Sequence, residues 1–243
     1  MLDKISIVIP TYNEEKFLPF LLKSIKKEIK NYKNLKNYEI IIADNNSNDK
    51  TIEIAKKFNC IITKGGNPAE ARNRGAKIAK HDLLFLDSDV VLPKYFLKNF
   101  LEKIKKENLD YATCRVEPLI KNKKNKKIES KIRFSFMLKN LGNKIFKNHV
   151  SGQCLFVKKQ ALNSIKGFDE TLYLAEEHDL AKRLNKKRFK GFFFYDIFVF
   201  CFSRRQEKEG TYRTLIKDIY SEIYRFFKEK IKKPIYKKEY GHY

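Results

Sequence analysis

The sequence predicts an α/β protein with a mostly parallel sheet and helices on both faces. Over the first 116 residues, short apolar runs of strand length alternate with segments whose apolar residues follow the helical period. Repeated strand–helix units of this length indicate a parallel sheet. With 243 residues, 42% of them hydrophobic, the chain can form one such domain with a substantial core and a short appendage.

The first elements follow one another from the N-terminus. Residues 5–9 and 38–43 are apolar runs typical of buried strands, and residues 17–29 and 51–58 carry helical spacing after each of them. A short third strand is predicted at residues 61–62. These segments give two complete strand–helix units and the start of a third.

The third helix has the clearest start signal in the chain. Asn67 is in the N-cap position, Pro68 follows in the first turn, and Glu70 comes three residues after the cap, which is the pattern of a capping box. Within this helix, Gly75 predicts close packing against the sheet. The fourth strand is predicted at residues 83–86.

Beyond this strand the alternation becomes less regular. A helix is predicted from residue 93 to about residue 108, and the segment 117–150 contains a lysine-rich loop. Residues 153–157 and 192–202 resemble further strands, separated by helical patterns. The loop is followed by a predicted amphipathic helix with an apolar face of Phe134, Met137, Leu138, Leu141 and Ile145.

The C-terminal part of the chain differs in character. Residues 211–233 form an apolar stripe at helical spacing, flanked by many Lys and Arg side chains. We therefore expect a main domain over residues 1–205 and a basic helical appendage over residues 206–243. We expect this helix to bind an anionic membrane surface. The alternative is that its apolar stripe packs on the main domain or on a second subunit of a homodimer.

The formal net charge of +24 is large, with 53 Lys and Arg against 29 Asp and Glu. Such a field attracts nucleic acid, anionic membranes or phosphorylated substrates, although a Lys-rich solvated surface explains the excess equally simply. No nucleic-acid-binding motif accompanies it, so nucleic acid is not an expected partner. The four cysteines show no zinc or disulfide spacing, and no signal peptide or bilayer-spanning run is visible. We expect a cytoplasmic protein, with membrane contact at its surface.

Two carboxylates follow the fourth predicted strand directly. Asp87 and Asp89 are one residue apart at its carboxyl end, where open α/β sheets bind their ligands. Two hard oxygen donors suit Mg²⁺ or Mn²⁺ shared with a substrate diphosphate. Because Asp-x-Asp also recurs in turns and helix caps, the pair needs support from other motifs.

Four motifs in sequence provide this support. The segments Ser6–Glu15, Ala43–Asp49, Ala71–Gly75 and Asp87–Asp89 together resemble the family 2 inverting glycosyltransferases of the GT-A fold, over about residues 3 to 205. The resemblance implies a nucleotide-binding sheet with a mixed, acceptor-side half. It implies a metal-dependent enzyme that moves a sugar from a nucleotide-diphosphate sugar to an acceptor hydroxyl or lipid phosphate. The alternatives are a basic nucleic-acid-binding protein and a glycosyltransferase-like domain without activity.

The first two motifs supply the expected donor pocket. Pro10, Thr11 and Tyr12 end the first strand, where an aromatic ring can cover a base. The resemblance assigns Thr11, Tyr12 and Glu14 to the nucleotide pocket, and Asp44 is expected to accept hydrogen bonds from a base edge. The family more often has a second acid after this position, whereas this chain has Asn45, so the base stays open. A helix cap is the structural alternative for Asp44.

The resemblance also gives roles to three groups around the metal. It implies that Arg72 reaches the nucleotide, that Asp89 binds the metal directly, and that Asp87 contacts the ribose or the metal through water. The metal would neutralise the leaving diphosphate. Arg74, in the same helix as Arg72, is a candidate surface residue.

The acceptor side is predicted from Ala175 to Leu180, which resembles the family's Glu-Asp-x-Asp-Leu motif. Glu177 occupies the position of the base that deprotonates the acceptor, with a longer side chain than the usual Asp. The alternative is a charged helix start, and His178 is expected to be exposed. Gly152 falls where the family lines the sugar pocket. Arg204 and Arg205 are candidates to clamp the donor diphosphate, or are surface residues.

Overall fold

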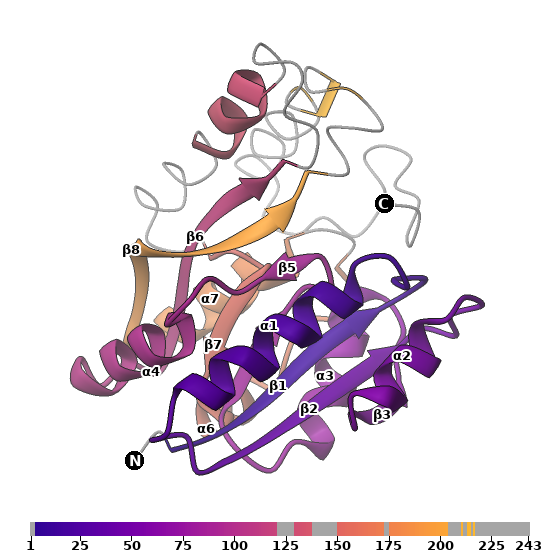
Figure 1. Ribbon diagram of the computed structural model, residues 1–243. Coiled ribbons are helices and arrows are strands. Elements are labelled where there is room, and N and C mark those ends of the chain that lie inside the picture. Colours follow the sequence, from indigo (N-terminus) through magenta and orange to yellow (C-terminus); the bar gives the residue numbers. More distant parts are fainter. Residues whose placement is uncertain are drawn as a thin grey trace.

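The computed structural model describes residues 3–120, 129–137, 150–172 and 175–203, together with residues 210, 213, 214 and 216. Within these residues the strands form one sheet with helices on both faces (Figure 1). The strands are β1 (Lys4–Thr11), β2 (Asn37–Asp44), β3 (Ile61–Lys64), β4 (Leu83–Leu86), β5 (Val90–Val91), β6 (Tyr111–Leu119), β7 (Cys154–Val157) and β8 (Gly191–Phe202). The helices are α1 (Leu18–Asn31), α2 (Thr51–Lys57), α3 (Pro68–Ile78), α4 (Phe96–Lys106), α6 (Lys159–Ser164) and α7 (Glu176–Lys186), and residues 129–137 are also helical.

The N-terminal half of the sheet is parallel, as predicted. β1 pairs in parallel with β2 and β4, and β2 pairs in parallel with β3. The carboxyl ends of these strands therefore meet at one edge of the sheet. The predicted strand at residues 83–86 matches β4, and the other predicted strands and helices of this half differ from the structure only at their ends.

The C-terminal half of the sheet is mixed. β7 is antiparallel to both β4 and β6, so that β6 runs in the same direction as β4. β8 pairs in parallel with β6, with a shift in register after Cys114, and pairs with the short β5 in an antiparallel way. The strand order is β3-β2-β1-β4-β7-β6-β8-β5, which confirms a parallel half joined to a mixed half.

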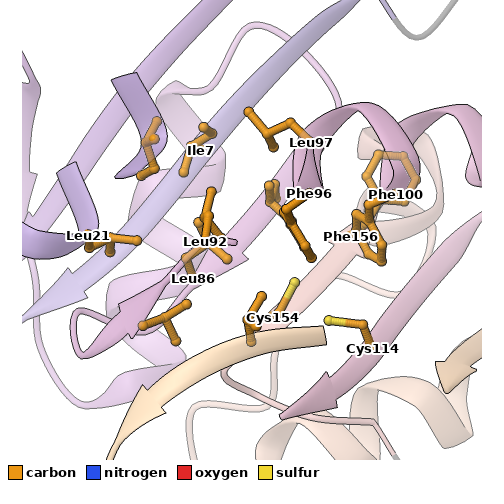
Figure 2. Packing of buried hydrophobic residues seen from close by; sticks show 14 of the residues in the cluster. Ile7, Leu21, Leu86, Leu92, Phe96, Leu97, Phe100, Cys114, Cys154 and Phe156 are labelled. Atoms are coloured by element: carbon orange, nitrogen blue, oxygen red, sulfur yellow. The ribbon is translucent and has the colours of Figure 1, made fainter. Parts of the chain in front are cut away.

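Both faces of the sheet are buried. In β1, Ile7 packs with α1 and α4 on one face, and Val8 packs with α3 on the other. Figure 2 shows the first face, where Leu21 of α1 and Leu97 of α4 lie near Ile7. A Cβ at Gly75 would overlap the side chain of Val8, which confirms that this glycine lets α3 approach the sheet closely. The capping box at the start of α3 is also present.

The helix of residues 129–137 buries a different face from the predicted one. Phe134 and Met137, both expected in the core, are 51% and 49% exposed, whereas Ile132 and Phe136 are buried. Apolar residues lie on two sides of this helix, so the sequence period alone did not decide which side meets the sheet. Leu138, Leu141 and Ile145 lie outside the described residues.

The cysteines are free, as predicted, with Cys114, Cys154 and Cys201 buried and Cys60 half-buried. Within the described part of the chain, no helix has both the length and the apolar character needed to cross a bilayer. Almost all of the predicted appendage, residues 206–243, lies outside the described residues, as do Arg204 and Arg205.

Candidate functional site

The predicted donor residues gather at the carboxyl edge of the parallel strands. Thr11 and Asp44 are register partners at the ends of β1 and β2, and the loop that carries Asp87 and Asp89 leaves the end of the neighbouring β4. The backbone N–H of Asp87 donates to Gln153 O at 3.2 Å, which fixes the start of this loop. The edge therefore has the topology of a ligand crevice in an open α/β sheet.

Asp44 is buried in a network of short hydrogen bonds. Its Oδ1 accepts from the hydroxyls of Thr11 (2.9 Å) and Ser47 (2.6 Å), and its Oδ2 accepts from the Ser47 N–H (2.8 Å). At the start of α2, the Thr51 N–H donates instead to Asp49 Oδ1 at 2.9 Å, and the N-cap residue is Lys50. Asp44 is thus not the cap of α2 but stabilises the turn that follows β2, and its contact with a base stays a prediction.

The loops after β1 and β2 are joined by hydrogen bonds that the sequence did not predict. Asn13, which has a positive φ of 55°, donates its N–H to Ser47 Oγ at 2.8 Å and accepts from the Asn48 N–H at 2.9 Å. Asn is one of the few residues that adopt this backbone conformation readily. The asparagine next to Tyr12 was the available signal for such a turn.

The other predicted nucleotide residues lie in or beside the same loop. Pro10 and Tyr12 are half-buried, whereas Glu14 is buried. The N–H of Glu14 donates to Thr51 Oγ1 at 2.7 Å, and its carbonyl oxygen accepts from the Leu18 N–H at 3.0 Å. The main chain of Glu14 therefore links the start of α1 to α2, and the predicted nucleotide contact of its side chain stays open.

Gly65, which the sequence analysis did not single out, lies against the main chain of the donor loop. A Cβ at this position would lie 2.6–2.7 Å from backbone atoms of Ala43, Asp44 and Asn45. Its N–H also donates to the Asp44 carbonyl at 2.6 Å. Only glycine allows this approach, so Gly65 fixes the position of Asp44.

Arg72 is the centre of the site. Its guanidinium donates to Glu176 Oε1 at 2.5 Å and to Asp87 Oδ1 at 3.0 Å, and it lies over the ring of Phe168. The Arg72 side chain is 6% exposed, and burial of a charge is tolerated only when ionic partners compensate it. The sequence predicted that Arg72 reaches the nucleotide, whereas the contacts described here are with two carboxylates. Glu176 is a partner that sequence spacing did not indicate.

Asp87 and Asp89 form the predicted acid pair. Asp89 is 9% exposed, and its carbonyl oxygen accepts from the Phe202 N–H at 3.1 Å, where β5 meets β8. Burial raises the pKa of Asp87 to about 6; Arg72 lowers it, while Asp89 and Glu176 raise it further. Negative charge is therefore crowded here, which is an arrangement that a bound cation stabilises.

The acceptor-side acids occupy the first turn of α7, after Ala175 in a left-handed conformation. Negative charges are favourable in this turn because of the helix dipole. The alternative interpretation, a charged helix start, is therefore correct for their position. Asp179 Oδ2 lies 2.6 Å from Arg183 Nε, so this carboxylate forms an ion pair within α7. Glu176 and Glu177 instead lie beside Arg72 and Gly152.

Glu177 has the environment of a base. A Cβ at Gly152 would lie 3.4 Å from Arg72 Nη2 and 3.4 Å from Glu177 Oε1, so the predicted Gly152 adjoins both residues. Burial raises the pKa of Glu177 to about 8, the charge of Glu176 adds to the rise, and Arg72 opposes it. A carboxylate with a raised pKa is a stronger base.

His178 is not exposed as predicted, since its side chain is only 14% exposed. Its Nδ1 accepts from the Val150 N–H at 3.3 Å, and its Nε2 lies 3.8 Å from Glu177 Oε1. The imidazole therefore packs between the residue 150–152 segment and the predicted base. The prediction of exposure was wrong because the segment before β7 covers that side of the helix.

The chain is similar in sequence to known glycosyltransferases. The chain is 31% identical over 123 residues to poly(ribitol-phosphate) β-N-acetylglucosaminyltransferase TarS from Staphylococcus aureus, covering 47% of this chain and 21% of TarS. It is 38% identical over 100 residues to 4,4'-diaponeurosporenoate glycosyltransferase from Staphylococcus haemolyticus, covering 37% and 25% of the two chains. The similarity thus spans a quarter or less of the length of these relatives.

Two solved structures share the fold. The crystal structure of S. aureus TarS 1-349 has a TM-score of 0.62 at 21% identity and covers 87% of this chain and 64% of that one. Mannosyltransferase PcManGT from Pyrobaculum calidifontis, in complex with GDP-Man and Mn²⁺, has a TM-score of 0.63 at 17% identity and covers 81% and 56%. The predicted GT-A type of fold is confirmed. Residues 6–165 match the family model described as Glycosyl transferase family 2, and because this match covers most of the chain, the protein belongs to glycosyltransferase family 2.

Proposed function

We propose that this chain is a metal-dependent, inverting glycosyltransferase that moves a sugar from a nucleotide-diphosphate sugar to an acceptor hydroxyl or lipid phosphate. The observation that supports this most directly is the position of Arg72 between Asp87 and Glu176. Through this contact, the acids after β4 and the acids that begin α7 form one site. A donor bound at Asp87 and Asp89 would then lie beside a base at Glu177.

The acids fit a divalent cation that is shared with substrate. Within the described residues, no group of three or more His, Cys, Asp or Glu side chains is placed to hold an ion. Asp87 and Asp89 together would leave several positions of Mg²⁺ or Mn²⁺ to water and diphosphate oxygens. When bound, the ion would neutralise the negative charge that develops on the leaving diphosphate.

The residues of the chain supply the remaining steps. The Glu177 carboxylate takes the proton of the acceptor hydroxyl while the acceptor oxygen forms its bond to the anomeric carbon. The bond between that carbon and the phosphate oxygen breaks, and its electron pair leaves with the nucleoside diphosphate. A single displacement of this kind inverts the anomeric configuration. Arg72 keeps Asp87 and Glu176 in place throughout.

The donor and the acceptor are proposed from the relatives. A crystal structure of S. aureus TarS contains UDP-GlcNAc, and that of PcManGT contains GDP-Man. UDP-GlcNAc and GDP-mannose are therefore the first donors to test. The name of TarS specifies poly(ribitol-phosphate), so a polymer that carries free hydroxyl groups is the first acceptor to test.

The test measures release of the nucleoside diphosphate, with Mn²⁺, over a panel of UDP- and GDP-sugars and hydroxyl acceptors. Asp89→Ala and Glu177→Gln are each expected to lower turnover at least about 100-fold. Asp196→Asn is the matched control, because Asp196 is an exposed acid on β8 that pairs with Lys103 on α4. Equal turnover by the parent protein and Asp89→Ala would refute the metal-dependent mechanism.

We also propose that the basic segment of residues 206–243 brings the enzyme to an anionic membrane surface from the cytoplasm, where lipid-linked acceptors are found. The support is the sequence pattern of an apolar stripe with flanking Lys and Arg. Cosedimentation with phosphatidylglycerol liposomes tests it. Absence of binding at low salt would favour packing of the stripe on the main domain or on a second subunit.

A further inference from the structure

A second pocket, with a volume of about 380 Å³, lies apart from the acids at Asp87, Asp89 and Glu177. It is formed by the C-terminal half of β6, the register shift of β8 and the helix of residues 129–137, which Figure 1 shows beyond the ends of these strands. Ligand sites for small molecules begin at about 300 Å³. The lining residues are Arg115, Glu117, Arg133, Phe134, Met137 and Tyr195.

Apolar side chains in this pocket are unusually exposed. Phe134, Met137 and Tyr195 are 51%, 49% and 39% exposed, although they lie together. The helix packs on the domain through Ile132 and Phe136 instead, so Phe134 and Met137 are not needed for its attachment. Clustered exposed apolar groups of this kind are typical of a binding surface.

The charged groups of the pocket come in balanced pairs. Arg115 Nε lies 3.3 Å from Glu117 Oε1, and Arg133 Nη2 lies 2.8 Å from Glu129 Oε1. The Arg115 guanidinium also lies over the ring of Tyr195, at 5.2 Å from its centroid, and its buried Nε has no hydrogen-bond partner among the described residues. The pocket lining therefore holds a guanidinium next to a carboxylate that accepts.

This chemistry fits a neutral, polyhydroxylated ligand. Each sugar hydroxyl both donates and accepts a hydrogen bond, and paired guanidinium and carboxylate groups offer both partners. The C–H face of a sugar ring is apolar and packs on an exposed aromatic ring. A phosphate group would be favoured by unpaired arginines, whereas both arginines here have carboxylate partners.

Strand β6 links the pocket to the segment that adjoins the catalytic site. Arg115 and Glu117 lie on the same face of this strand as Thr113, because side chains alternate between the two faces. Thr113 Oγ1 accepts from the Ser151 N–H at 3.1 Å, and a Cβ at the next residue, Gly152, would lie 3.4 Å from Glu177 Oε1. Thr113 and Ser151 are 0% and 4% exposed, so β6 joins the pocket to the segment beside the proposed base through the protein interior.

We propose that this pocket binds a neutral sugar ring of the acceptor glycan, at a distance along the glycan from the unit that receives the transferred sugar. The role as acceptor rests on the proposed function, but binding of the glycan needs neither donor nor turnover. The pocket would then select acceptors by a sugar unit that does not itself react.

The test applies the full-length protein, in EDTA and without donor, to immobilised neutral oligosaccharides and to ribitol-phosphate and glycerol-phosphate polymers. We expect the parent to bind at least one neutral oligosaccharide. Tyr195→Ala and Phe134→Ala are each expected to weaken that binding about five- to tenfold. Tyr38→Ala is the matched control, because Tyr38 is a similarly exposed aromatic residue on β2, away from the pocket.

Thermal melting of each variant separates loss of binding from loss of folding, and the exposure of Phe134 makes its truncation mild for stability. The proposal is overturned if the parent binds no neutral oligosaccharide, if it binds only the phosphate polymers, or if both pocket variants bind like the parent. Asp89→Ala is expected to bind the oligosaccharide normally. Equal nucleotide release by the parent and Asp89→Ala, or no release by the parent with any donor, would contradict the proposed function, and intact oligosaccharide binding in the same proteins would leave the pocket in place.

Discussion

Arg72 on α3 donates a 2.5 Å hydrogen bond to Glu176 on α7, although the two residues are 104 positions apart. Both side chains are almost fully buried, and the same guanidinium also holds Asp87 after β4. The interaction joins the nucleotide half of the sheet to the helix that carries the proposed base. It therefore contributes both to stability and to the geometry of the site.

Arg72→Met is expected to lower the free energy of unfolding by about 3 kcal/mol, because it leaves buried carboxylates without their cation. The estimate is at the low end for buried pairs because the Asp87 side chain is 34% exposed and partly screened by solvent. Urea denaturation measures the change. Lys57→Met, which removes an exposed ion pair with Glu53, is the control and should unfold like the parent. A midpoint for Arg72→Met equal to that of the control would show that the buried pair contributes nothing.

Local signals in the sequence were sufficient for much of the fold. The apolar run at residues 83–86 is long enough for one buried strand, and Asn67 with Glu70 forms the capping box that its spacing predicts. Gly75 packs against Val8 as its place in the helix predicts. Such features depend on a few neighbouring residues or on one face of an element, and for that reason they can be recognised without a structure.

Long-range pairings were beyond the reach of sequence patterns. The two residues of β5 are too few to show a period, and their partner is β8, more than a hundred residues later. Arg72 was recognised as functional, but its contact with Glu176 depends on how α7 packs on α3. His178 faces inward because residues 150–152 cover it, which no helical period reveals.

The pKa of Glu177 makes stability depend on pH. Burial raises the pKa of this carboxyl to about 8, from a value near 4.5 in the unfolded chain. The folded protein therefore binds the proton more tightly, so the stability from this group is complete below about pH 4 and is lost as the pH rises through about 8. Glu177→Gln keeps a neutral group of the same shape and removes this loss.

We expect Glu177→Gln to be more stable than the parent at pH 8.5 by about 1–3 kcal/mol, with a smaller difference at pH 5. Urea denaturation in EDTA at both pH values measures the two differences, so that no metal contributes. Glu117→Gln, which changes a carboxylate in the second pocket, controls for charge removal in general. A difference that does not change with pH would contradict the raised pKa.

His178 is predicted to position the base. His178→Phe removes the acceptor for the Val150 N–H and the polar neighbour of Glu177, while it fills a similar volume. We expect kcat to fall about tenfold and the KM for the donor to stay nearly unchanged, because the donor side is intact. In His178→Asn, an amide oxygen can replace Nδ1 as acceptor and should restore part of kcat. A His178→Phe enzyme with the parent's kcat would show that the imidazole only fills space.

Gly65 is predicted to control the nucleotide side of the site. In Gly65→Ala the added methyl would lie 2.6 Å from the carbonyl carbon of Asp44 and 2.7 Å from Asn45 N, so the backbone at the end of β2 must move. We expect UDP and GDP to bind at least about fivefold more weakly by calorimetry, since Asp44 moves with that backbone. Gly66→Ala is the comparison from the same loop, because its methyl would meet only the side chain of Glu70 and would disturb the capping box of α3 rather than the turn at Asp44. Weakened binding in both variants would point to a general effect on the loop, whereas weakening in Gly65→Ala alone would identify the Asp44 turn as part of the nucleotide pocket.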